Sequence, residues 1–198
     1  MWHWSLNWAE ITPTIVVGTC PMTPDDLERI HLEAQCNAVL SVQHDDCLAH
    51  WGIDEGALQA RADALGITRS RRPMRDFVVE DQRRHLPAAV SALAAMQRAG
   101  RRTYVHCTAG LGRAPLTVWS YLSWVEGQPS DEAVGLIKAR RAGAVPAPEA
   151  HEGCHEDLLA RYRDAYLAGA GPDWPDPDRL EDPAATQAAL RALLLAEG

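Results

Sequence analysis

The sequence predicts an α/β fold in which a mixed or parallel central sheet is flanked by helices. Short apolar runs typical of strands alternate along the chain with longer segments whose apolar residues recur at helical spacing. The expected strands are 15–17, 38–42 and 103–105, with a weaker candidate at 67–74. The expected helices are 24–34, 55–65, 87–99, 116–125, 130–141 and 184–197. This alternation is typical of a sheet wrapped by helices.

Local signals at helix ends support two of these helices. Thr23 offers a capping hydroxyl, and Pro24 follows at the first helical position, where its missing N–H costs nothing. Ser130 is a second capping residue, and Asp131 and Glu132 follow it with negative charges that suit a helix N-terminus. The helices that begin near 24 and 130 are therefore expected on capping chemistry as well as on periodicity.

Length and composition indicate one domain with a tail. A chain of 198 residues with 46% hydrophobic content can bury one sizeable core. We expect a catalytic domain at 1–168, followed at 169–198 by a connector rich in Gly, Pro and Asp and a last helix that docks back on the domain. The net charge of −8 argues against a nucleic-acid partner, which needs clustered cationic side chains.

The cysteines and the absence of long apolar runs indicate a soluble protein in a reducing compartment. Five widely spaced cysteines make a disulfide framework improbable. No window approaches the roughly 18 apolar residues of a membrane span, and the first residues lack a basic segment followed by an apolar run. We expect a cytoplasmic location, or a plastid if a transit peptide has been removed. We also expect no cofactor, no membrane partner and, for the oligomeric state, a monomer.

Residues 105–115, with the sequence VHCTAGLGRAP, contain the candidate catalytic and anion-binding residues. It lies between the expected strand 103–105 and an apolar helical run, at a strand-to-helix turn. Its two glycines let successive backbone N–H groups bend into a concave nest, and the helix N-terminus adds its positive dipole end. The predicted phosphate-binding residues are Thr108, Ala109, Gly110, Leu111, Gly112 and Arg113.

Cys107 is the candidate nucleophile of this nest. A free thiol, with a pKa of about 8.5, is mostly protonated at neutral pH, but a helix N-terminus and a nearby arginine favour the thiolate. The thiolate can attack phosphorus while the nest and the Arg113 fork hold the other phosphate oxygens. The alternative is that Cys107 is only a buried cysteine at a tight turn.

The pattern His-Cys-x5-Arg between a strand and a helix resembles the cysteine-dependent phosphatases of the protein tyrosine and dual-specificity superfamily. Most dual-specificity members have Ser or Thr after the arginine, where a hydroxyl assists the departing thiolate, whereas Ala114 and Pro115 supply none here. The ending Arg-Ala-Pro is similar to the loop of plant glucan (starch) phosphatases. The resemblance implies a dual-specificity-phosphatase-like domain and gives His106 a supporting role.

Phosphocysteine chemistry also needs a general acid that protonates the leaving alkoxide. The resemblance places an aspartate about thirty residues before the cysteine, where Asp76, Glu80 and Asp81 lie. The run Arg-Asp-Phe at 75–77 is similar to the plant glucan phosphatases, in which this aspartate is the acid. Asp76 is therefore the predicted acid, and Asp81 is the alternative.

Aromatic side chains are the candidate sugar contacts. The chain has seven Trp and one Phe, and sugar rings stack their C–H faces on such rings. The resemblance extends from about 7 to 166 and aligns Trp8, Trp51 and Phe77 with a glucan-binding channel. Val145, the fourth predicted glucan contact, stands where the family usually has a phenylalanine, which is expected to alter the preferred glucose position. The alternative is that these rings belong to the core, a role we expect for Trp119 and Trp124.

The polar segment 43–46 follows the expected strand 38–42, and we expect it to be a loop at the ligand end of the sheet. A second motif, His-Glu-x-x-His at 151–155, fits a zinc pattern. Gly153 lies inside it, two prolines precede it closely, and the sequence marks no third ligand. We therefore expect a segment at the start of a helix and no metal.

The sequence thus predicts a glucan phosphatase acting on phosphorylated α-glucan. Two alternatives stay open, a dual-specificity phosphatase acting on phosphoproteins and a glucan-binding protein that has lost turnover. The intact set of Cys107, Arg113 and Asp76 argues against the second alternative.

Overall fold

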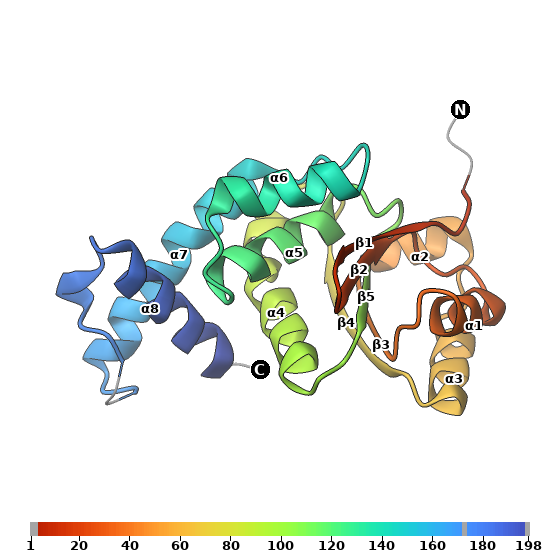
Figure 1. Ribbon diagram of the computed structural model, residues 1–198, viewed down its shortest axis with the longest axis horizontal. Helices are drawn as coiled ribbons and strands as arrows, with labels where there is room; N and C mark the ends of the chain where they lie inside the picture. Colours follow the sequence, from red (N-terminus) through yellow and green to blue (C-terminus); the bar gives the residue numbers. More distant parts are fainter. Residues whose placement is uncertain (1–3, 172–173, 197–198) are drawn as a thin grey trace.

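The computed structural model describes residues 4–171 and 174–196. In these residues a five-stranded sheet has the order β1-β2-β5-β3-β4 (Figure 1). Only the first strand runs antiparallel, and the rest of the sheet is parallel. The strands are β1 Trp8–Thr12, β2 Ile15–Gly18, β3 Ala38–Gln43, β4 Thr68–Met74 and β5 Thr103–His106. The predicted mixed α/β sheet is confirmed, and β5 lies at its centre.

Helices cover both faces of the sheet, as Figure 1 shows. The helices of the first half of the chain are α1 Pro24–Leu32, α2 Asp45–Trp51, α3 Glu55–Leu65 and α4 Val79–Arg98. Those of the second half are α5 Arg113–Trp124, α6 Ser130–Arg140, α7 Pro148–Leu167, the short 3-10 helix η1 Pro177–Arg179, and α8 Pro183–Ala196. The sheet separates two apolar cores, one on each face, because successive side chains of a strand point to opposite faces. Tyr104 packs with α1 and α3, whereas Val105 packs with α4 and α5.

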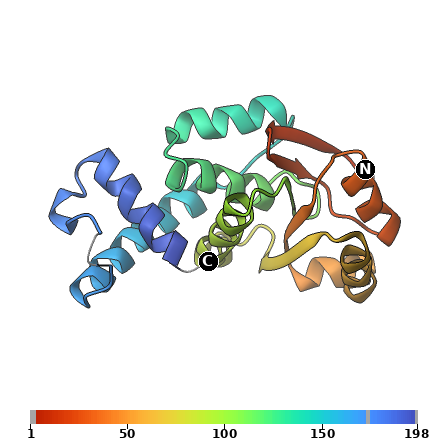
Figure 2. The ribbon, with the colours of Figure 1, turned by 60° about the horizontal axis from the view of Figure 1, so that its bottom comes forward.

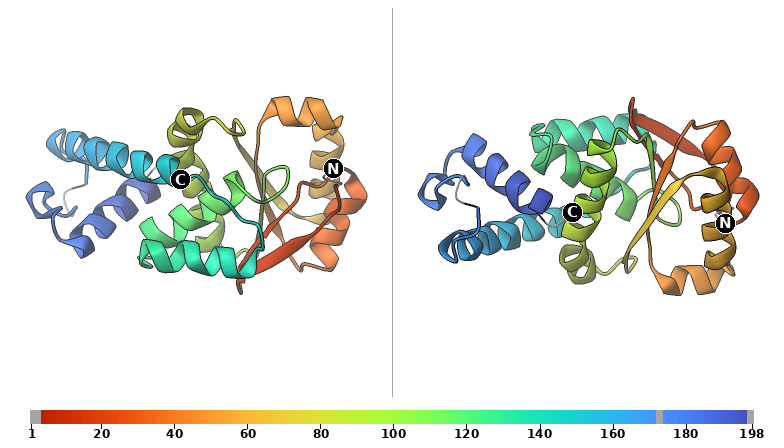
Figure 3. Two further views of the ribbon diagram at one scale, coloured as in Figure 1. Left: turned by 90° about the horizontal axis from the view of Figure 1, so that it is seen from above. Right: turned by 90° about the horizontal axis from the view of Figure 1, so that it is seen from below.

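The C-terminal helices extend the molecule away from the sheet, which Figures 2 and 3 show from other sides. Helix α8 packs against α4, α5 and α7, and its Leu190, Leu193 and Leu194 belong to the same core as Val105. The connector is held to α7 by Tyr162, whose ring stacks on Trp174 at 5.0 Å. The predicted docking of the last helix is confirmed, while the domain boundary after residue 168 stays a prediction.

Capping chemistry is present at one of the two helix starts where the sequence predicts it. The prediction that Ser130 caps a helix is wrong, because Ser130 is the first residue of α6, the N-cap residue is Pro129, and the Ser130 hydroxyl instead accepts a bond from Trp119 Nε1 at 3.0 Å. The other predicted cap, at the start of α1, is formed. The Thr23 hydroxyl accepts a bond from the Asp26 N–H, and the Asp26 carboxylate accepts bonds from the N–H groups of Met22 and Thr23. Together these bonds satisfy donors that an uncapped helix leaves free. The helix predicted from residue 24 is therefore confirmed.

Four elements differ from the sequence prediction. Strand β1 was not expected, and the segment 43–46, predicted as a loop, leads at Asp45 into helix α2. Helix α7 starts at Pro148 and runs unbroken through 151–155. Helix α4 begins at Val79, eight residues before the predicted start, and contains Pro87. Burial of Leu86 and of the following apolar face compensates for the hydrogen bond that the proline removes. No helix in the described ranges is long and apolar enough to cross a membrane.

Candidate active site

The Cys-x5-Arg loop lies at the carboxyl end of the central strand. Strand β5 ends at His106 and helix α5 begins at Arg113, so the loop joins a buried strand to a helix N-terminus. His106 is in register with Gly18 of β2 on one side and Ser41 of β3 on the other. Ligand sites of α/β sheets form at such strand ends, and the predicted strand-to-helix turn is present.

The loop is held open by bonds to its outward-facing carbonyl groups. Each carbonyl from 107 to 111 accepts a hydrogen bond: Cys107 from His106 Nδ1 at 2.9 Å, Thr108 from Cys20 N at 2.9 Å, Ala109 from Arg141 Nη2 at 3.0 Å, Gly110 from Arg141 Nε at 3.2 Å, and Leu111 from Val145 N at 2.7 Å. A peptide plane whose C=O points outward points its N–H inward. Among the described residues, none accepts a bond from the N–H groups of 108–112. We call residues 107–113 the phosphate cup.

One of the two glycines of the cup is required by geometry. Gly110 has φ +67°, and an added Cβ would lie 2.3 Å from the Gly18 carbonyl oxygen. Both the left-handed backbone and the close approach exclude other residues there. Gly112 has φ −109° and open space around it, so the turn itself does not require a glycine at that position, contrary to the sequence argument.

Cys107 differs from the other buried cysteines of the chain in its surroundings. Burial raises the pKa of Cys20 and of Cys154 to about 12, and that of Cys36 to about 11, so these thiols stay protonated. Cys107 is 3% exposed but lies at the N-terminal end of α5, beside the Arg113 guanidinium. Cys47 also lies near this group, with its Sγ 3.5 Å from Arg113 Nη1.

Arg113 is fully buried and anchored under the cup. Its Nη1 donates to the Met74 carbonyl at 2.9 Å, and its Nη2 contacts Thr108 Oγ1 at 3.3 Å and Asp76 Oδ2 at 2.9 Å. Burial alone would lower the pKa of Arg113, but the negative charges of Cys107 and Asp76 outweigh it and raise the pKa. The guanidinium therefore keeps its charge in a buried position, where its field acts strongly on an anion.

His106 stabilises the loop as a neutral ring. Burial lowers the pKa of His106 to about 3, against a smaller opposing effect of its bond to the Cys107 carbonyl. The carbonyl can only accept, so Nδ1 carries the proton of this neutral ring. His106 can therefore orient the first peptide of the cup but cannot supply a proton near neutral pH.

The structure brings Asp76 to the cup and gives Asp81 a different role. Asp76 pairs with Arg113, whereas Asp81 Oδ2 accepts the N–H of Arg75 at 2.6 Å and so ties the loop to the first turn of α4. Gln82 also binds Arg75, because its Nε2 donates to the Arg75 carbonyl at 3.2 Å. Phe77 follows with φ +58°, a strained conformation for a bulky residue. The loop that carries Asp76 is thus a fixed feature of the fold.

A mainly apolar hollow of about 400 Å³ lies over the cup. It is lined by Asp76, Phe77, Val79, Gln82, Cys107, Ala109, Leu111, Gly112, Val145 and Ala147. Phe77 and Val145 are 93% and 71% exposed, so two of the predicted glucan contacts stand at its rim. Val79, Gln82 and Ala147 were missed by the sequence argument, because nothing in their local pattern places them near residue 107.

The two tryptophans predicted as glucan contacts do not line this hollow. Trp8 is half-buried and meets Tyr104 edge-on at 6.4 Å, and Trp51 is half-buried beside His50 at 5.3 Å. Both pack against the core on the α1 and α3 side. Their role in glucan binding stays a prediction, because contacts with the core cover part of the surface of both rings.

The His-Glu-x-x-His motif is part of the helical core. The ring of His151 stacks on Trp119 at 3.8 Å and on Trp124 at 4.7 Å, and its Nδ1 lies 2.9 Å from Ser120 Oγ. Burial lowers the pKa of His151 to about 4. No group of three or more His, Cys, Asp or Glu side chains that could hold a metal ion occurs within the described ranges. The motif therefore serves packing between α5 and α7.

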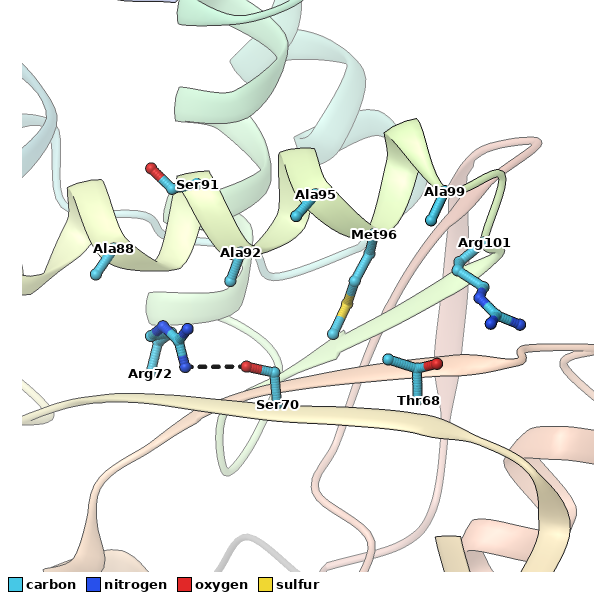
Figure 4. Close-up of a pocket in the computed structure, with 10 residues that line it drawn as sticks. All are labelled: Thr68, Ser70, Arg72, Ala88, Ser91, Ala92, Ala95, Met96, Ala99 and Arg101. Atoms are coloured by element: carbon cyan, nitrogen blue, oxygen red, sulfur yellow. Dashed lines mark hydrogen bonds between the residues drawn. The ribbon is translucent and has the colours of Figure 1, made fainter. Parts of the chain in front are cut away.

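A second hollow, of about 440 Å³, lies between the edge strand β4 and helix α4 (Figure 4). We call it the β4–α4 groove. It is lined by Thr68, Ser70, Arg72, Ala88, Ser91, Ala92, Ala95, Met96, Ala99 and Arg101. Figure 4 shows the alanines of α4 turned toward the strand, while Arg72 bonds to Ser70 of its own strand at 3.0 Å. The groove holds no nucleophilic thiol and no carboxylate.

Comparison with known proteins agrees with this geometry. Residues 23–152 match the family model described as dual specificity phosphatase, catalytic domain. The chain belongs to this family. The resemblance inferred from the cup sequence is therefore confirmed at the level of the family, and the cup is the part of this dual specificity phosphatase domain in which the family's Cys-x5-Arg pattern is found.

Two plant proteins are similar to this dual specificity phosphatase domain over most of its length. The amyloplastic phosphoglucan phosphatase DSP4 of Castanea sativa is 34% identical over 87% of this chain and 45% of its own length. The chloroplastic phosphoglucan phosphatase LSF1 of Arabidopsis thaliana is 30% identical over 69% of this chain and 23% of its own. The chain thus spans less than half the length of either relative.

Solved structures support the fold. The crystal structure of PTPMT1 superposes with a TM-score of 0.62 at 21% identity, and the match covers 79% of this chain and 99% of that one. At this identity the likeness concerns the fold alone.

Proposed function

We propose that this chain is a glucan phosphatase that hydrolyses phosphate monoesters on starch-like or glycogen-like α-glucans through a phosphocysteine intermediate. The observation that carries the proposal is the phosphate cup, with Cys107 at its start and Asp76 bonded to Arg113 at 2.9 Å. A thiolate, an anion nest and a carboxyl group are the set that phosphoryl transfer to cysteine needs. The names of the two plant relatives support the glucan part of the proposal.

In the first step, Cys107 acts as the nucleophile. Its sulfur forms a bond to phosphorus while the bond from phosphorus to the sugar oxygen breaks. The Arg113 fork and the N–H groups of residues 108–113 hold the remaining oxygens as charge moves in the transition state. Incoming phosphate takes over the Arg113 Nη2 that the Asp76 carboxylate occupies in the free site. The freed carboxylate, without its guanidinium partner and beside a phosphate anion, takes up a proton from solvent and then donates that proton to the leaving alcohol.

In the second step, water attacks the phosphocysteine. The carboxylate of Asp76 now accepts a proton from the water, the new P–O bond forms, and the P–S bond breaks with its electrons on sulfur. His106 keeps the first peptide of the cup oriented through its bond to the Cys107 carbonyl, at 2.9 Å. Phosphate then leaves, and Asp76 returns to Arg113.

The glucan would approach across the apolar rim. Phe77 is exposed and is the one aromatic residue among those that line the hollow. Leu111 and Val145 add further apolar surface beside it. Such a surface suits the C–H faces of glucose rings. The relatives' names place those proteins in plastids, and for this chain a plastid or a cytoplasmic location stays a prediction.

The test compares phosphate release from solubilised phosphorylated amylopectin with release from phosphotyrosine and phosphoserine peptides. We expect a strong preference for the glucan, and loss of all release in Cys107→Ser with an unchanged melting temperature. Phe77→Ala should lower turnover of glucan about tenfold and leave a small aryl phosphate nearly unchanged, because only the extended substrate reaches the rim. Release by Cys107→Ser at the rate of the unmodified protein would contradict the mechanism.

A phosphatase acting on phosphoproteins is the second candidate, and one observation favours it. Trp8 and Trp51 do not line the hollow, so its aromatic surface is smaller than the predicted channel. Equal or faster release from phosphopeptides would select this candidate. A glucan-binding protein without turnover is excluded by any hydrolysis of a generic aryl phosphate that requires Cys107.

A further inference from the structure

Strand β4 forms one edge of the sheet and leaves part of its backbone without a strand partner. Among the described residues its only neighbouring strand is β3. The Thr68 N–H points toward β3, because it donates to the Asn37 carbonyl at 3.1 Å. Peptide groups alternate in direction along a strand, and the register with β3 is regular up to Arg71, so the N–H and C=O groups of Arg69 and Arg71 point to the open side. This edge offers the hydrogen bonds that an added strand would use.

One of these edge groups is bound by a side chain instead of a strand. The Arg71 carbonyl accepts a bond from Arg72 Nη1 at 2.8 Å, and the same nitrogen donates to Ser70 Oγ at 3.0 Å. Arg72 is exposed, so its guanidinium can move away without opening the core. An incoming strand can therefore replace this bond with a backbone bond and give the guanidinium an acidic partner.

The β4–α4 groove lies along the same edge and is open to solvent. Its helical wall consists of small side chains, which Figure 4 shows turned toward β4: Ala88, Ala92, Ala95 and Ala99. Ala88 and Ala99 are exposed and Ala95 is half-buried, so no described segment fills the groove. Met96 also lines it, with a flexible side chain that can adapt to a ligand. Every second side chain of a strand added beside β4 would enter this space.

Two arginines lie at the ends of the groove without an acidic partner. Figure 4 shows Arg72 at one end and Arg101 at the other, and no carboxylate is among the residues that line the space between them. The other arginines of the strand, Arg69 and Arg71, pair with acidic side chains of α3 and α2. Uncompensated positive charge in a chain of net charge −8 favours an acidic ligand at this place.

The same charges argue against a second copy of this chain as the occupant. Two copies joined edge to edge would place the Arg72 and Arg101 side chains of both on one continuous face, where like charges repel. Charged side chains on an edge strand are a common protection against such self-association. They do not exclude a strand of opposite charge, and so they select between partners.

We propose that the β4–α4 groove binds an extended acidic segment of a partner protein, which adds to the sheet as a sixth strand beside β4. Thr68, Ser70 and Arg72 line the groove, so the segment residues opposite them face it too. The residue opposite Ser70 is apolar and packs on the alanines of α4. The residues two positions before and after it carry carboxylates that pair with Arg72 and Arg101.

The expected recognition motif is therefore acidic-x-apolar-x-acidic. This activity goes beyond the proposed phosphatase reaction, because none of the residues that line the groove belongs to the phosphate cup or to the hollow above it. Binding at the groove thus leaves the cup free and does not require turnover.

The first experiment is an NMR titration of the whole chain with the synthetic peptide acetyl-Thr-Glu-Thr-Val-Thr-Glu-Thr-amide. We expect saturable binding and hydrogen exchange of the Arg69 and Arg71 amides slowed by at least about tenfold, because a sixth strand covers these N–H groups. The same peptide with Lys in place of both Glu should bind at least about tenfold more weakly. No saturation at up to about 1 mM peptide, equal binding of the Lys peptide, or binding without protection of these amides would overturn the proposal.

Two groove variants and a matched control locate the site. Ala95→Leu fills the space and Arg72→Glu reverses the charge of an exposed side chain, so each should weaken binding of the Glu peptide by at least about tenfold. Arg72→Glu should also bind the Lys peptide more tightly than the wild-type protein does. Arg163→Glu makes the same charge change at an exposed position of α7 and should alter binding by less than about twofold. Equal weakening in Arg163→Glu and Arg72→Glu would overturn the proposal, because the attraction would then not belong to the groove.

Other occupants of the groove give different results. A wild-type dimer in sedimentation that Ala95→Leu makes monomeric would show that a second copy occupies the groove. Displacement of the peptide by maltoheptaose would show that the groove binds glucan. Either result overturns the acidic-strand proposal and leaves the Cys107→Ser test of the phosphatase reaction unaffected, so failure of this inference and failure of the proposed function are distinguishable.

Discussion

The hollow over the phosphate cup and the β4–α4 groove have nearly the same volume, about 400 and 440 Å³, but opposite chemistry. The first has a buried arginine below it, a thiol at its base and a carboxyl at its rim. The second has a wall of alanines from α4 and two arginines, Arg72 of β4 and Arg101 of the segment that joins α4 to β5. Size alone does not indicate a reactive site, whereas oriented donors around an empty space do.

The difference follows from position in the sheet. The cup follows β5, whose neighbours β2 and β3 supply backbone and side-chain partners from both sides. The groove lies at β4, the edge strand, where one side has no strand to pair with. Helix α4 faces both places, with Gln82 at the cup and Ala92 at the groove. At the cup, fixed polar groups therefore surround one anion-sized space, whereas the fixed polar side chain of Arg69 on the edge strand pairs with Glu55 and does not line the groove.

The largest expected effect contrasts one arginine from each hollow. Arg113→Lys should lower kcat/KM about a thousandfold, because an ammonium cannot replace a fork that donates to Met74, Thr108 and phosphate at once. Arg72→Lys should leave kcat/KM unchanged, because within the described residues Arg72 bonds to Ser70 and Arg71 of its own strand and to no group of the cup. Steady-state kinetics with an aryl phosphate measure both.

The control for this pair is thermal unfolding of the two variants. Arg113 is fully buried, so a fall in melting temperature of Arg113→Lys is expected, and assays are made well below that temperature. Equal losses of kcat/KM in the two variants would contradict the comparison, because the groove would then affect turnover as strongly as the cup.

The next largest effect concerns the two aspartates of one loop. Asp76→Asn should slow hydrolysis of an alkyl phosphate about a hundredfold or more, and of an activated aryl phosphate much less, because only the alkoxide needs a proton to leave. Asp81→Asn should affect both substrates alike, since Asp81 holds the Arg75 N–H and not the reacting group. A larger substrate dependence in Asp81→Asn would reverse the assignment.

Much of the fold could be predicted because its local signals agree with its tertiary packing. The capping box at Thr23 and the apolar run of β3 lie where the sequence indicates them. Helix α2 escaped prediction because seven residues are too short for a periodicity to develop, and its His44 cap is uncommon. The start of α4 was missed because Pro87 breaks the pattern that burial of the same face maintains.

The site could be predicted in its chemistry but not in its support. Cys107 and Arg113 belong to one contiguous motif, so a single stretch indicates both. Arg141, whose side chain binds the carbonyls of Ala109 and Gly110, lies about thirty residues away in a segment with no signal of its own. Contacts between remote residues of this kind depend on the folded path of the chain, which a single sequence does not contain.

A smaller expected effect is a pH dependence of stability. His106, beside the cup, contributes to it, whereas the groove is lined by no His, Asp or Glu. The folded-state pKa of His106 is about 3, below the unfolded value near 6.5, so the unfolded chain takes up the proton first as pH falls. Stability should therefore decrease between pH 6.5 and 3, by roughly 1.4 kcal/mol per pH unit for this group. His151, with a pKa of about 4, adds to the same trend.

Urea unfolding at pH 7 and pH 5 measures this dependence. From pH 7 to pH 5 the free energy of unfolding of the wild-type protein should fall by about 2 kcal/mol or more. The free energy of unfolding of His106→Gln should fall less, because this variant has no ring to protonate at position 106. The residues that line the groove include no His, Asp or Glu, so Ser70→Ala should keep the wild-type difference. An unchanged difference in His106→Gln would contradict the assignment to this ring.

The smallest expected effect is obtained by filling the groove. Ala95 is half-buried on the face of α4 that borders the empty space, so Ala95→Leu can place its added carbons there in a favourable helix rotamer. Unfolding should then cost up to about 1 kcal/mol more, from added apolar burial, and kcat/KM should not change. The matched change in the cup is Gly110→Ala, which adds a single carbon against the Gly18 carbonyl and should lower kcat/KM more than about tenfold. A loss of turnover in Ala95→Leu equal to that in Gly110→Ala would show that the two hollows are coupled, because α4 borders both and could transmit a shift from Ala95 to Gln82.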